Sequence, residues 1–156
     1  MDRTDLKLLA LLQEDAAMSH ADLGERVGLS PSQCSRRIQR LSNDGVIRRQ
    51  VALLDEALLG FNVEAFIMVA LTSYASEAVV AFHARMIANS AIVECCALTG
   101  DSDYLLRVVT LDLPALSLLI NEVLLGHGDV ASVRSSIVLN RIKRTTALPL
   151  RTAKES

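Results

Sequence analysis

The 156-residue sequence contains no tryptophan and only three phenylalanines, two tyrosines and three prolines. With so few aromatic rings, the chain is a poor candidate for binding single-stranded nucleic acid by base stacking. It also lacks the apolar run of about 18 residues that a membrane-spanning helix requires. The N-terminus, MDRTDLK, has none of the basic-then-apolar order of a secretory signal. These absences predict a cytoplasmic protein with no membrane partner.

Cysteine is also scarce. Cys34 stands alone and Cys95 and Cys96 are adjacent, so the chain has neither an even set of cysteines nor a CxxC pair. We therefore expect reduced thiols that pack as small apolar side chains. The three histidines are far apart in the sequence and predict no metal site. We expect no cofactor.

What the sequence does contain is many aliphatic side chains and an uneven distribution of charge. Hydrophobic residues make up 51% of the chain, which is enough to form one large domain or two small ones. Residues 1–49 hold eight basic and seven acidic side chains, residues 50–140 hold three and ten, and residues 141–156 hold five and one. A basic segment beside an acidic middle predicts two parts with different tasks.

The first fifty residues have the pattern of three short helices. Residues 2–13 place leucines close to the helical period of about 3.6 residues. Ser19 can cap a second helix, which Gly28 ends. Ser30 can cap a third helix, and Pro31 suits its first position. Two short helices joined by a turn of a few residues are typical of a helix-turn-helix.

The third predicted helix is amphipathic. Cys34, Ile38 and Leu41 form its apolar stripe, and the opposite side carries serine, glutamine and arginine, which bind base edges and phosphates in a major groove. The alternative is a solvated basic face on an ordinary helix, but the spacing, capping residues and charge together favour DNA binding. The residues expected at the DNA are Ser32, Gln33, Arg36 and Arg40 on the helix, Arg37 on its flank, and Arg48 and Arg49 beyond it.

The rest of the chain predicts a β-α-β-β-α-β sandwich with both helices on one face of the sheet. The predicted strands are residues 63–72, 91–98, 104–110 and 130–139, and the predicted helices are residues 76–88 and 112–125. Because the strands are apolar, we expect the uncovered face to pair with a second subunit, giving at least a dimer. Residues 46–51 also have the composition of a strand.

The fold class is therefore α+β, with a winged-helix-like helix-turn-helix domain joined by a strand hinge to a ferredoxin-like sandwich. The expected divisions are a DNA-binding domain at 1–49, a hinge at 50–61, a sandwich and oligomerisation domain at 62–150, and a flexible tail at 151–156.

The corner between the second and third strands is unusually polar. Its sequence, TGDSDY, is compatible with a plain turn, a metal site or a pocket for a small molecule. Asp101 and Asp103 could bind a divalent cation, but no third acidic ligand lies nearby in the sequence. Ser135 and Ser136 have no histidine in a recognisable catalytic arrangement, so we expect no enzyme activity. For Tyr104, packing and ligand contact remain equal alternatives.

Four segments of the chain, in this order, resemble the Lrp/AsnC family of feast/famine regulators. They run from Asp2 to Ala16, from Leu23 to Arg49, from Thr99 to Val108 and from Val133 to Leu150. The resemblance implies a transcriptional regulator that binds double-stranded DNA and forms a homodimer or a higher oligomer such as an octamer. It also implies a small effector, in many members an amino acid, bound between neighbouring subunits near the polar corner.

Carried over to this sequence, the resemblance implies an effector site at that corner and on the last strand. Glycine there lets backbone N–H groups approach a carboxylate, and aspartate can accept hydrogen bonds from an ammonium group. Small side chains at Ala97 and Ser136 depart from some relatives and suggest a different or larger effector. The implied residues are Ala97, Thr99, Gly100, Asp101, Asp103, Tyr104, Ser136 and Ile137.

Two other functions stay open at this point. Sandwiches of this type also serve as amino-acid-sensing regulatory subunits of metabolic enzymes, although that function leaves the arginine-rich third helix without a role. An enzyme that uses a metal at Asp101 and Asp103 is the other alternative. Salt-dependent DNA binding would favour a transcriptional regulator over a regulatory subunit of an enzyme. Loss of function on chelation would favour the metal-dependent enzyme.

Overall fold

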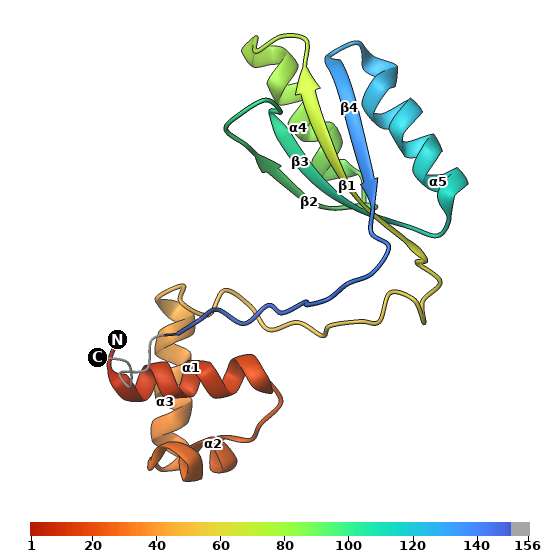
Figure 1. Cartoon of the computed structure of the whole chain (residues 1–156). Helices are drawn as coiled ribbons and strands as arrows, with labels where there is room; N and C mark the ends of the chain where they lie inside the picture. Colours follow the sequence, from red (N-terminus) through yellow and green to blue (C-terminus); the bar gives the residue numbers. More distant parts are fainter. Residues whose placement is uncertain (151–156) are drawn as a thin grey trace. The chain divides into compact units, whose positions relative to one another are not determined.

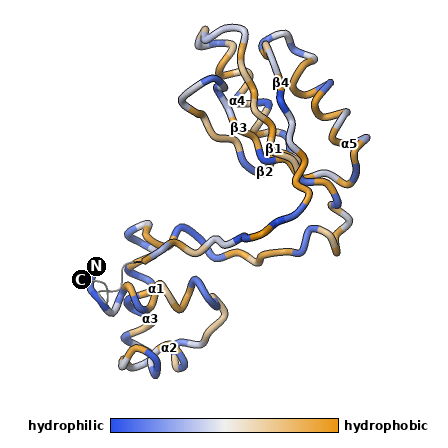
Figure 2. Tube along the Cα trace, in the orientation of Figure 1, coloured by the Kyte–Doolittle hydropathy of each residue, from blue (hydrophilic) through white to orange (hydrophobic). Residues whose placement is uncertain are grey.

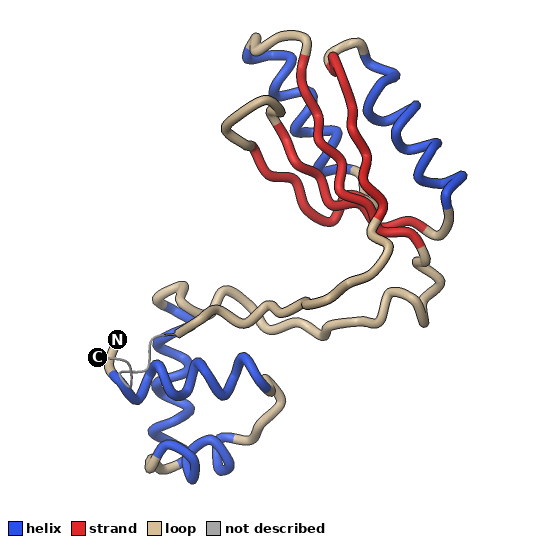
Figure 3. The backbone as a smooth tube through the Cα atoms, in the orientation of Figure 1, coloured by secondary structure: helices blue, strands red, loops and turns tan. Residues whose placement is uncertain are grey.

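The computed structural model describes residues 1–150 and divides the chain into two compact units (Figure 1). Residues 1–53 belong to the first unit, together with the segment that starts at Lys143, and residues 54–142 form the second. Figure 3 shows helices without strands in the first unit, and helices with a sheet in the second. The mixed α+β class predicted from the sequence is confirmed.

The first unit is built from three helices, whose capping residues agree with the sequence. Ser19 and Ser30 cap the second and third helices with their side chains, and Pro31 opens the third. Leu8, Leu23 and Cys34, one from each helix, are fully buried together. The helices are α1 (Arg3–Glu14), α2 (His20–Val27) and α3 (Pro31–Asn43).

Gly24 shows why a poor helix former stands inside α2. A Cβ at this position would lie 2.4 Å from the carbonyl oxygen of Leu29, and the Gly24 carbonyl accepts a hydrogen bond from the Leu29 N–H at 2.9 Å. In this structure, glycine therefore allows α2 to approach the turn before α3, which compensates for its cost of about 1 kcal/mol against alanine.

The second unit contains one four-stranded sheet, in which every neighbouring pair of strands is antiparallel. The strand order β2-β3-β1-β4 is that of the predicted split β-α-β arrangement. Figure 1 shows α4 and α5 beside the sheet. The strands are β1 (Val63–Leu71), β2 (Ile92–Ala97), β3 (Tyr104–Thr110) and β4 (Val130–Ile137), and the helices are α4 (Ser76–Ala88) and α5 (Leu113–Leu118).

The core of this unit lies between the sheet and its helices. Alternate residues of β1, from Ala65 to Leu71, are buried, and Phe82 and Met86 of α4 pack in the same cluster. The opposite face of the sheet is less apolar than predicted. Phe66 and Met68 lie there, but their partners on β4 in the register are polar, namely Ser136 and Arg134.

Three predicted elements differ from the structure by more than one residue at an end. Residues 46–51 form no strand, because a strand needs a hydrogen-bonded neighbour and no strand within residues 1–150 pairs with them (Figure 3). The last strand ends at Ile137 rather than at residue 139. The helix after Asp112 does continue, but it changes to a π-helix over residues 119–124 and a short 3-10 turn over residues 125–127.

The segment after β4 lies outside the sheet. Residues 138–150 have no strand, and the amide side chain of Gln13 binds the backbone of Leu148 instead. The Gln13 Nε2 donates to the Leu148 carbonyl at 3.2 Å, and the Leu148 N–H donates to Gln13 Oε1 at 2.6 Å. The predicted tail, residues 151–156, lies outside the described residues.

Candidate nucleic-acid interface and effector corner

A capping box fixes the backbone at the start of α3, beside the exposed side of the helix. The Ser30 Oγ accepts from the Gln33 N–H at 3.3 Å, and the Gln33 Oε1 accepts from the Ser30 N–H at 2.9 Å. Ser32 is exposed beside this box, with its Oγ 3.1 Å from that of Ser30. The first turn therefore presents hydroxyl and amide groups on a rigid backbone.

A polar depression of about 340 Å³ follows along the same helix face. Because its lining residues are three, four and seven positions apart, they share one side of the helix. Arg36 is exposed and has no ion-pair partner within residues 1–150. The structure thus brings four of the predicted DNA-binding residues together in this depression: Gln33, Arg36, Arg37 and Arg40.

Two of these arginines have partners that were not predicted from the sequence. Arg37 Nη1 donates to Asp2 at 2.6 Å and to Asp5 at 2.8 Å, and Arg40 Nη2 donates to Asp5 at 2.7 Å. The Asp5 side chain is only 1% exposed, whereas that of Arg40 is 51% exposed. Arg37 and Arg40 therefore connect α3 to α1 while facing the depression.

The electrostatics of this cluster favour the charged forms. Burial alone raises the pKa of the Asp5 carboxyl, but hydrogen bonds from the Asp2 N–H and from Arg37, with the charge of Arg40, outweigh it and lower the pKa. Hydrogen bonds to Asp2 and Asp5 raise the pKa of the Arg37 guanidinium. The cluster is thus ionised at neutral pH.

The sequence contained one signal for this cluster. Asp5, Leu8, Leu9 and Leu12 are three, four and seven residues apart, so an acidic residue stands in the apolar stripe of α1. A carboxylate in such a position needs a cationic partner from another element. Its identity could not be read from local spacing, since Arg37 and Arg40 are more than thirty residues away.

Arg48 and Arg49 lie beyond α3 in the irregular segment that follows it. Both are exposed. The structure does not bring them into the depression, which is lined by helix residues alone. Their assignment as phosphate-binding residues remains a prediction.

The polar corner joins β2 to β3 and is closed by backbone hydrogen bonds. The Leu98 N–H donates to the Asp103 carbonyl at 2.8 Å, and the Asp103 N–H donates to the Val69 carbonyl at 2.9 Å. Gly100 has a φ of +122°, a conformation that favours glycine. Thr99 and Asp101 are exposed on the turn. The corner therefore presents backbone and one carboxylate to its surroundings.

The carboxylate of Asp103 is already occupied. One oxygen accepts from the Leu71 N–H at 2.7 Å, and the other accepts from the Tyr74 hydroxyl at 2.7 Å. This interaction raises the pKa of Tyr74, because ionising the phenol would place a negative charge beside Asp103. In this chain Asp103 joins the corner to the end of β1. The sequence had instead suggested a direct hydrogen bond between Asp103 and a ligand.

The Tyr104 side chain packs in the core of the second unit. It is 8% exposed, its ring centroid lies 4.7 Å from that of Phe82, and its hydroxyl lies 2.8 Å from His83 Nε2. Burial raises the pKa of its phenol. Both partners belong to α4, so the Tyr104 side chain lies on the helix-covered face of the sheet.

The remaining predicted effector residues do not meet within one chain. Ala97 is on the edge strand β2, whereas Ser136 and Ile137 are on the opposite edge strand β4. Three inter-strand spacings separate these edges, roughly 14 Å in total. Ser136 pairs with Phe66 and Ile137 with Ala65, so the two neighbours also point to opposite faces. One chain therefore does not enclose a single small ligand with this set.

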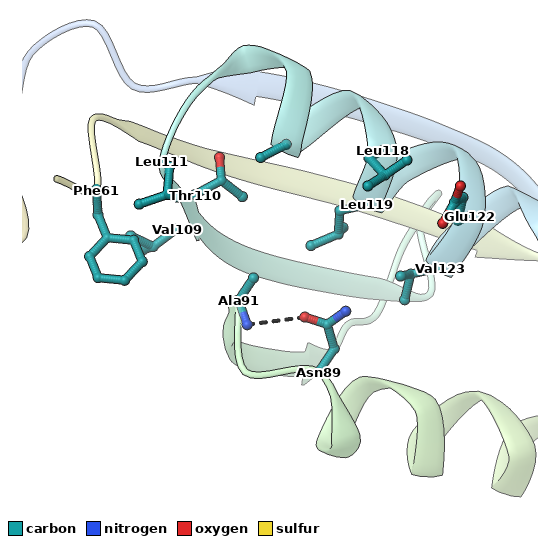
Figure 4. A pocket seen from close by; sticks show the side chains of 11 residues that line it. Phe61, Asn89, Ala91, Val109, Thr110, Leu111, Leu118, Leu119, Glu122 and Val123 are labelled. Carbon is teal, nitrogen blue, oxygen red and sulfur yellow. Dashed lines mark hydrogen bonds between the residues drawn. The ribbon is translucent and has the colours of Figure 1, made fainter.

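A separate hollow of about 300 Å³ lies at the other end of β3 (Figure 4). Apolar side chains form most of its wall, with Glu122 and Asn89 also lining it. Asn89 is held in place because its Oδ1 accepts from the Ala91 N–H at 3.0 Å. None of the predicted effector residues lines this hollow.

Further observations concern metal binding, membrane-spanning helices and the cysteines. Within residues 1–150, no group of three or more histidine, cysteine, aspartate or glutamate side chains is placed to hold a metal ion. In the same part of the chain, no helix combines the length and hydrophobicity of a membrane span. All three cysteines are free thiols, and Cys34 is buried in the helical core.

Comparison with known proteins matches both units. The model of the AsnC-type helix-turn-helix domain matches residues 1–42, and that of the Lrp/AsnC ligand binding domain matches residues 64–148. The transcriptional regulator AzlB of Bacillus subtilis is 33% identical over 150 residues, which are 96% of each chain. The leucine-responsive regulatory protein of Salmonella typhimurium is 34% identical over 152 residues, covering 97% of this chain and 93% of that protein.

Solved structures agree with these matches. A transcriptional regulator of Neisseria meningitidis, crystallised in complex with L-methionine, superposes with a TM-score of 0.93 at 40% identity and covers 97% of both chains. An AsnC family regulator of Agrobacterium tumefaciens superposes with a TM-score of 0.90 at 40% identity, covering 96% of this chain and 97% of that one. The similarity thus extends over nearly the whole chain.

Proposed function

The chain belongs to the Lrp/AsnC family of transcriptional regulators, and from this premise we propose that α3 docks in the major groove of double-stranded DNA while the second unit senses an amino acid. The observation that carries the proposal is the polar depression on α3, where Gln33 and three arginines gather. Because bacterial promoters lie in the cytoplasm, the protein acts there. The family match favours this function over a regulatory subunit of an enzyme.

The proposed DNA-binding residues form three groups, according to where they lie in the chain. Ser32, Gln33 and Arg36 are exposed on α3 and lie where they can approach base edges, whereas Arg37 and Arg40 are partly engaged with α1. Arg48 and Arg49 contribute phosphate contacts, which give affinity without sequence information. Arg36 is the most accessible test of this arrangement.

Replacing Arg36 with alanine should weaken DNA binding without changing the assembly. We expect roughly a tenfold loss of affinity and, where Arg36 meets a phosphate, a salt dependence shallower by about one counterion. Lys7→Ala is the matched control, since Lys7 is an exposed cation on α1. It stands two residues from Asp5 and so on the other side of that helix from the contact with α3. Equal affinities for the Arg36 variant and the parent in a gel-shift series at fixed salt would contradict the assignment.

The effector proposal rests on the corner and on the relative that was crystallised with L-methionine. Backbone N–H groups around Gly100 bind the carboxylate of an amino acid, and the exposed Asp101 accepts from its ammonium group. Asp103 shapes the corner through Leu71 and Tyr74. The site is completed by Ala97, Thr99, Ser136 and Ile137 when a neighbouring subunit brings the two sheet edges together. Tyr104 supports the corner from the core side through Phe82 and His83.

Calorimetry with the twenty amino acids tests this site. We expect at least one to bind the parent protein, Asp101→Asn to bind it about tenfold more weakly through loss of a charge-assisted hydrogen bond, and Glu77→Gln, an exposed acidic control on α4, to bind it normally. An Asp101→Asn variant with full affinity would remove Asp101 from the site.

The mechanism is a coupling between effector and subunit arrangement. An effector that binds one arrangement of subunits more tightly shifts the population toward it and changes the spacing of the α3 helices. The assembly is at least a homodimer and extends to a larger oligomer such as an octamer. Its support is the exposed apolar surface of Leu53, Leu54 and Leu58, which are 74%, 67% and 87% exposed in the single chain.

A further inference from the structure

The arginines on the DNA-facing side of α3 are held by a carboxylate that is itself buried. Asp5 comes from α1, its side chain is 1% exposed, and it binds Arg37 at 2.8 Å and Arg40 at 2.7 Å. It also accepts from the Asp2 N–H at 2.9 Å. A buried carboxylate that lost these donors would remain unsatisfied, so the pairing is strongly favoured.

The geometry of these bonds leaves N–H groups for another ligand. Arg37 uses only Nη1 for Asp2 and Asp5, and Arg40 uses only Nη2. A guanidinium carries five N–H donors in a rigid planar fork. Because one corner of each fork is fixed, the direction of the remaining donors is also restricted. Both arginines line the depression on α3.

Building on the proposed DNA-binding function, we infer that Asp5 is a positioning residue that determines sequence specificity. It holds Arg37 and Arg40 in one orientation, so their outward N–H groups meet the duplex at defined places. Phosphate contacts made by mobile arginines give affinity for any sequence, whereas directed bidentate contacts discriminate between bases. Asp5 acts through the arginines and does not touch DNA.

The charge of Asp5 gives this role a distinctive consequence. The carboxylates of Asp2 and Asp5 offset part of the positive charge that α3 presents to the phosphate backbone. Neutralising Asp5 adds one net positive charge to this region, releases Arg40 from its ion pair and leaves Arg37 paired with Asp2 alone. A merely structural role predicts weaker binding to every duplex, whereas positioning predicts a loss of discrimination alone.

The test uses the full-length chain with Asp5→Asn and two DNA duplexes. One is a duplex that the parent protein enriches from a random library, and the other is a scrambled duplex of the same length and composition. We expect the ratio of the two affinities to fall at least about fivefold, the lower end for one bidentate base contact. Affinity for the scrambled duplex should stay constant or rise, with an equal or steeper salt dependence.

Two further variants sharpen the test. Asp2→Asn is the matched control, because the Asp2 side chain is 54% exposed and within residues 1–150 it forms an ion pair with Arg37 alone. Its affinity ratio should therefore fall less. Arg40→Lys keeps the positive charge and can still pair with Asp5, but it lacks the planar fork. Its ratio should fall as in Asp5→Asn, and it decides the matter where circular dichroism shows that Asp5→Asn does not fold.

Three results would overturn the inference. They are an unchanged affinity ratio in folded Asp5→Asn, a parallel loss on both duplexes in that folded variant, and an unchanged ratio in Arg40→Lys. A different result bears on the proposed function. A parent protein that enriches no duplex from the library contradicts DNA recognition by α3, and this is seen before any variant is made.

Discussion

At the scale of single residues, the paired carboxylates of α1 make stability depend on pH. Hydrogen bonds with Arg37 lower the pKa of Asp2, and the network described above lowers the pKa of Asp5. A carboxyl whose pKa is lower in the folded chain stabilises the fold above its unfolded pKa of about 3.9, and this contribution is lost as the pH falls further.

Thermal unfolding of the parent and of Asp5→Asn should therefore converge in acid. At pH 7 the parent should melt at a higher temperature, because the amide cannot replace a carboxylate that pairs with two arginines. Below about pH 4 the difference should shrink, since protonation removes the same charge from the parent. Circular dichroism melts at several pH values measure this, and a difference that is constant from pH 7 to pH 3 would contradict it.

Some features of these residues could be predicted from the sequence and others could not. The α3 side chains that line the depression follow from helical spacing and were predicted. The partners of Asp5 and Asp103 were not, because each is joined to residues about thirty positions away. Periodicity predicts the side of an element on which a residue lies, whereas long-range contacts depend on how two elements pack.

At the scale of elements, Asp103 is a connection between the β2–β3 corner and the end of β1. Replacing it with alanine removes the acceptor of the Leu71 N–H and of the Tyr74 hydroxyl. We expect a loss of stability of about 1–3 kcal/mol and faster hydrogen exchange at the Leu71 amide. Asp101→Ala is the control, since Asp101 has no such bond within residues 1–150. Unaltered exchange at Leu71 in the Asp103 variant would show that another acceptor takes over.

Most elements of the second unit were predictable because local signals agreed. The helix over residues 76–88 and the strand over residues 104–110 have the predicted bounds, and Asp112 caps α5 by accepting from the Ala115 N–H. The π-helix over residues 119–124 was not predictable, because its apolar composition fits an ordinary α-helix equally well.

At the scale of the whole molecule, the exposed hydrophobic residues point to further copies of the chain. Figure 2 shows hydrophobic stretches along residues 46–62 and 138–150, which form neither helix nor strand. Leu139 and Ile142 are 96% and 88% exposed in the single chain. No strand within residues 1–150 pairs with residues 46–51. Because these residues have the composition of a paired strand, we propose that a neighbouring subunit supplies their partner.

The uncovered face of the sheet provides the last test. Met68 lies there at 44% exposure beside Phe66 on β1, so Met68→Glu places a charge where a second sheet would pack. We expect light scattering to show a mass reduced to about half or less of the parent assembly, as a paired interface is lost. Val80→Glu is the control, because Val80 is 66% exposed on α4, in the helix layer. A Met68 variant that keeps the parent mass would place the subunit interface elsewhere and leave the apolar residues of this face without a partner.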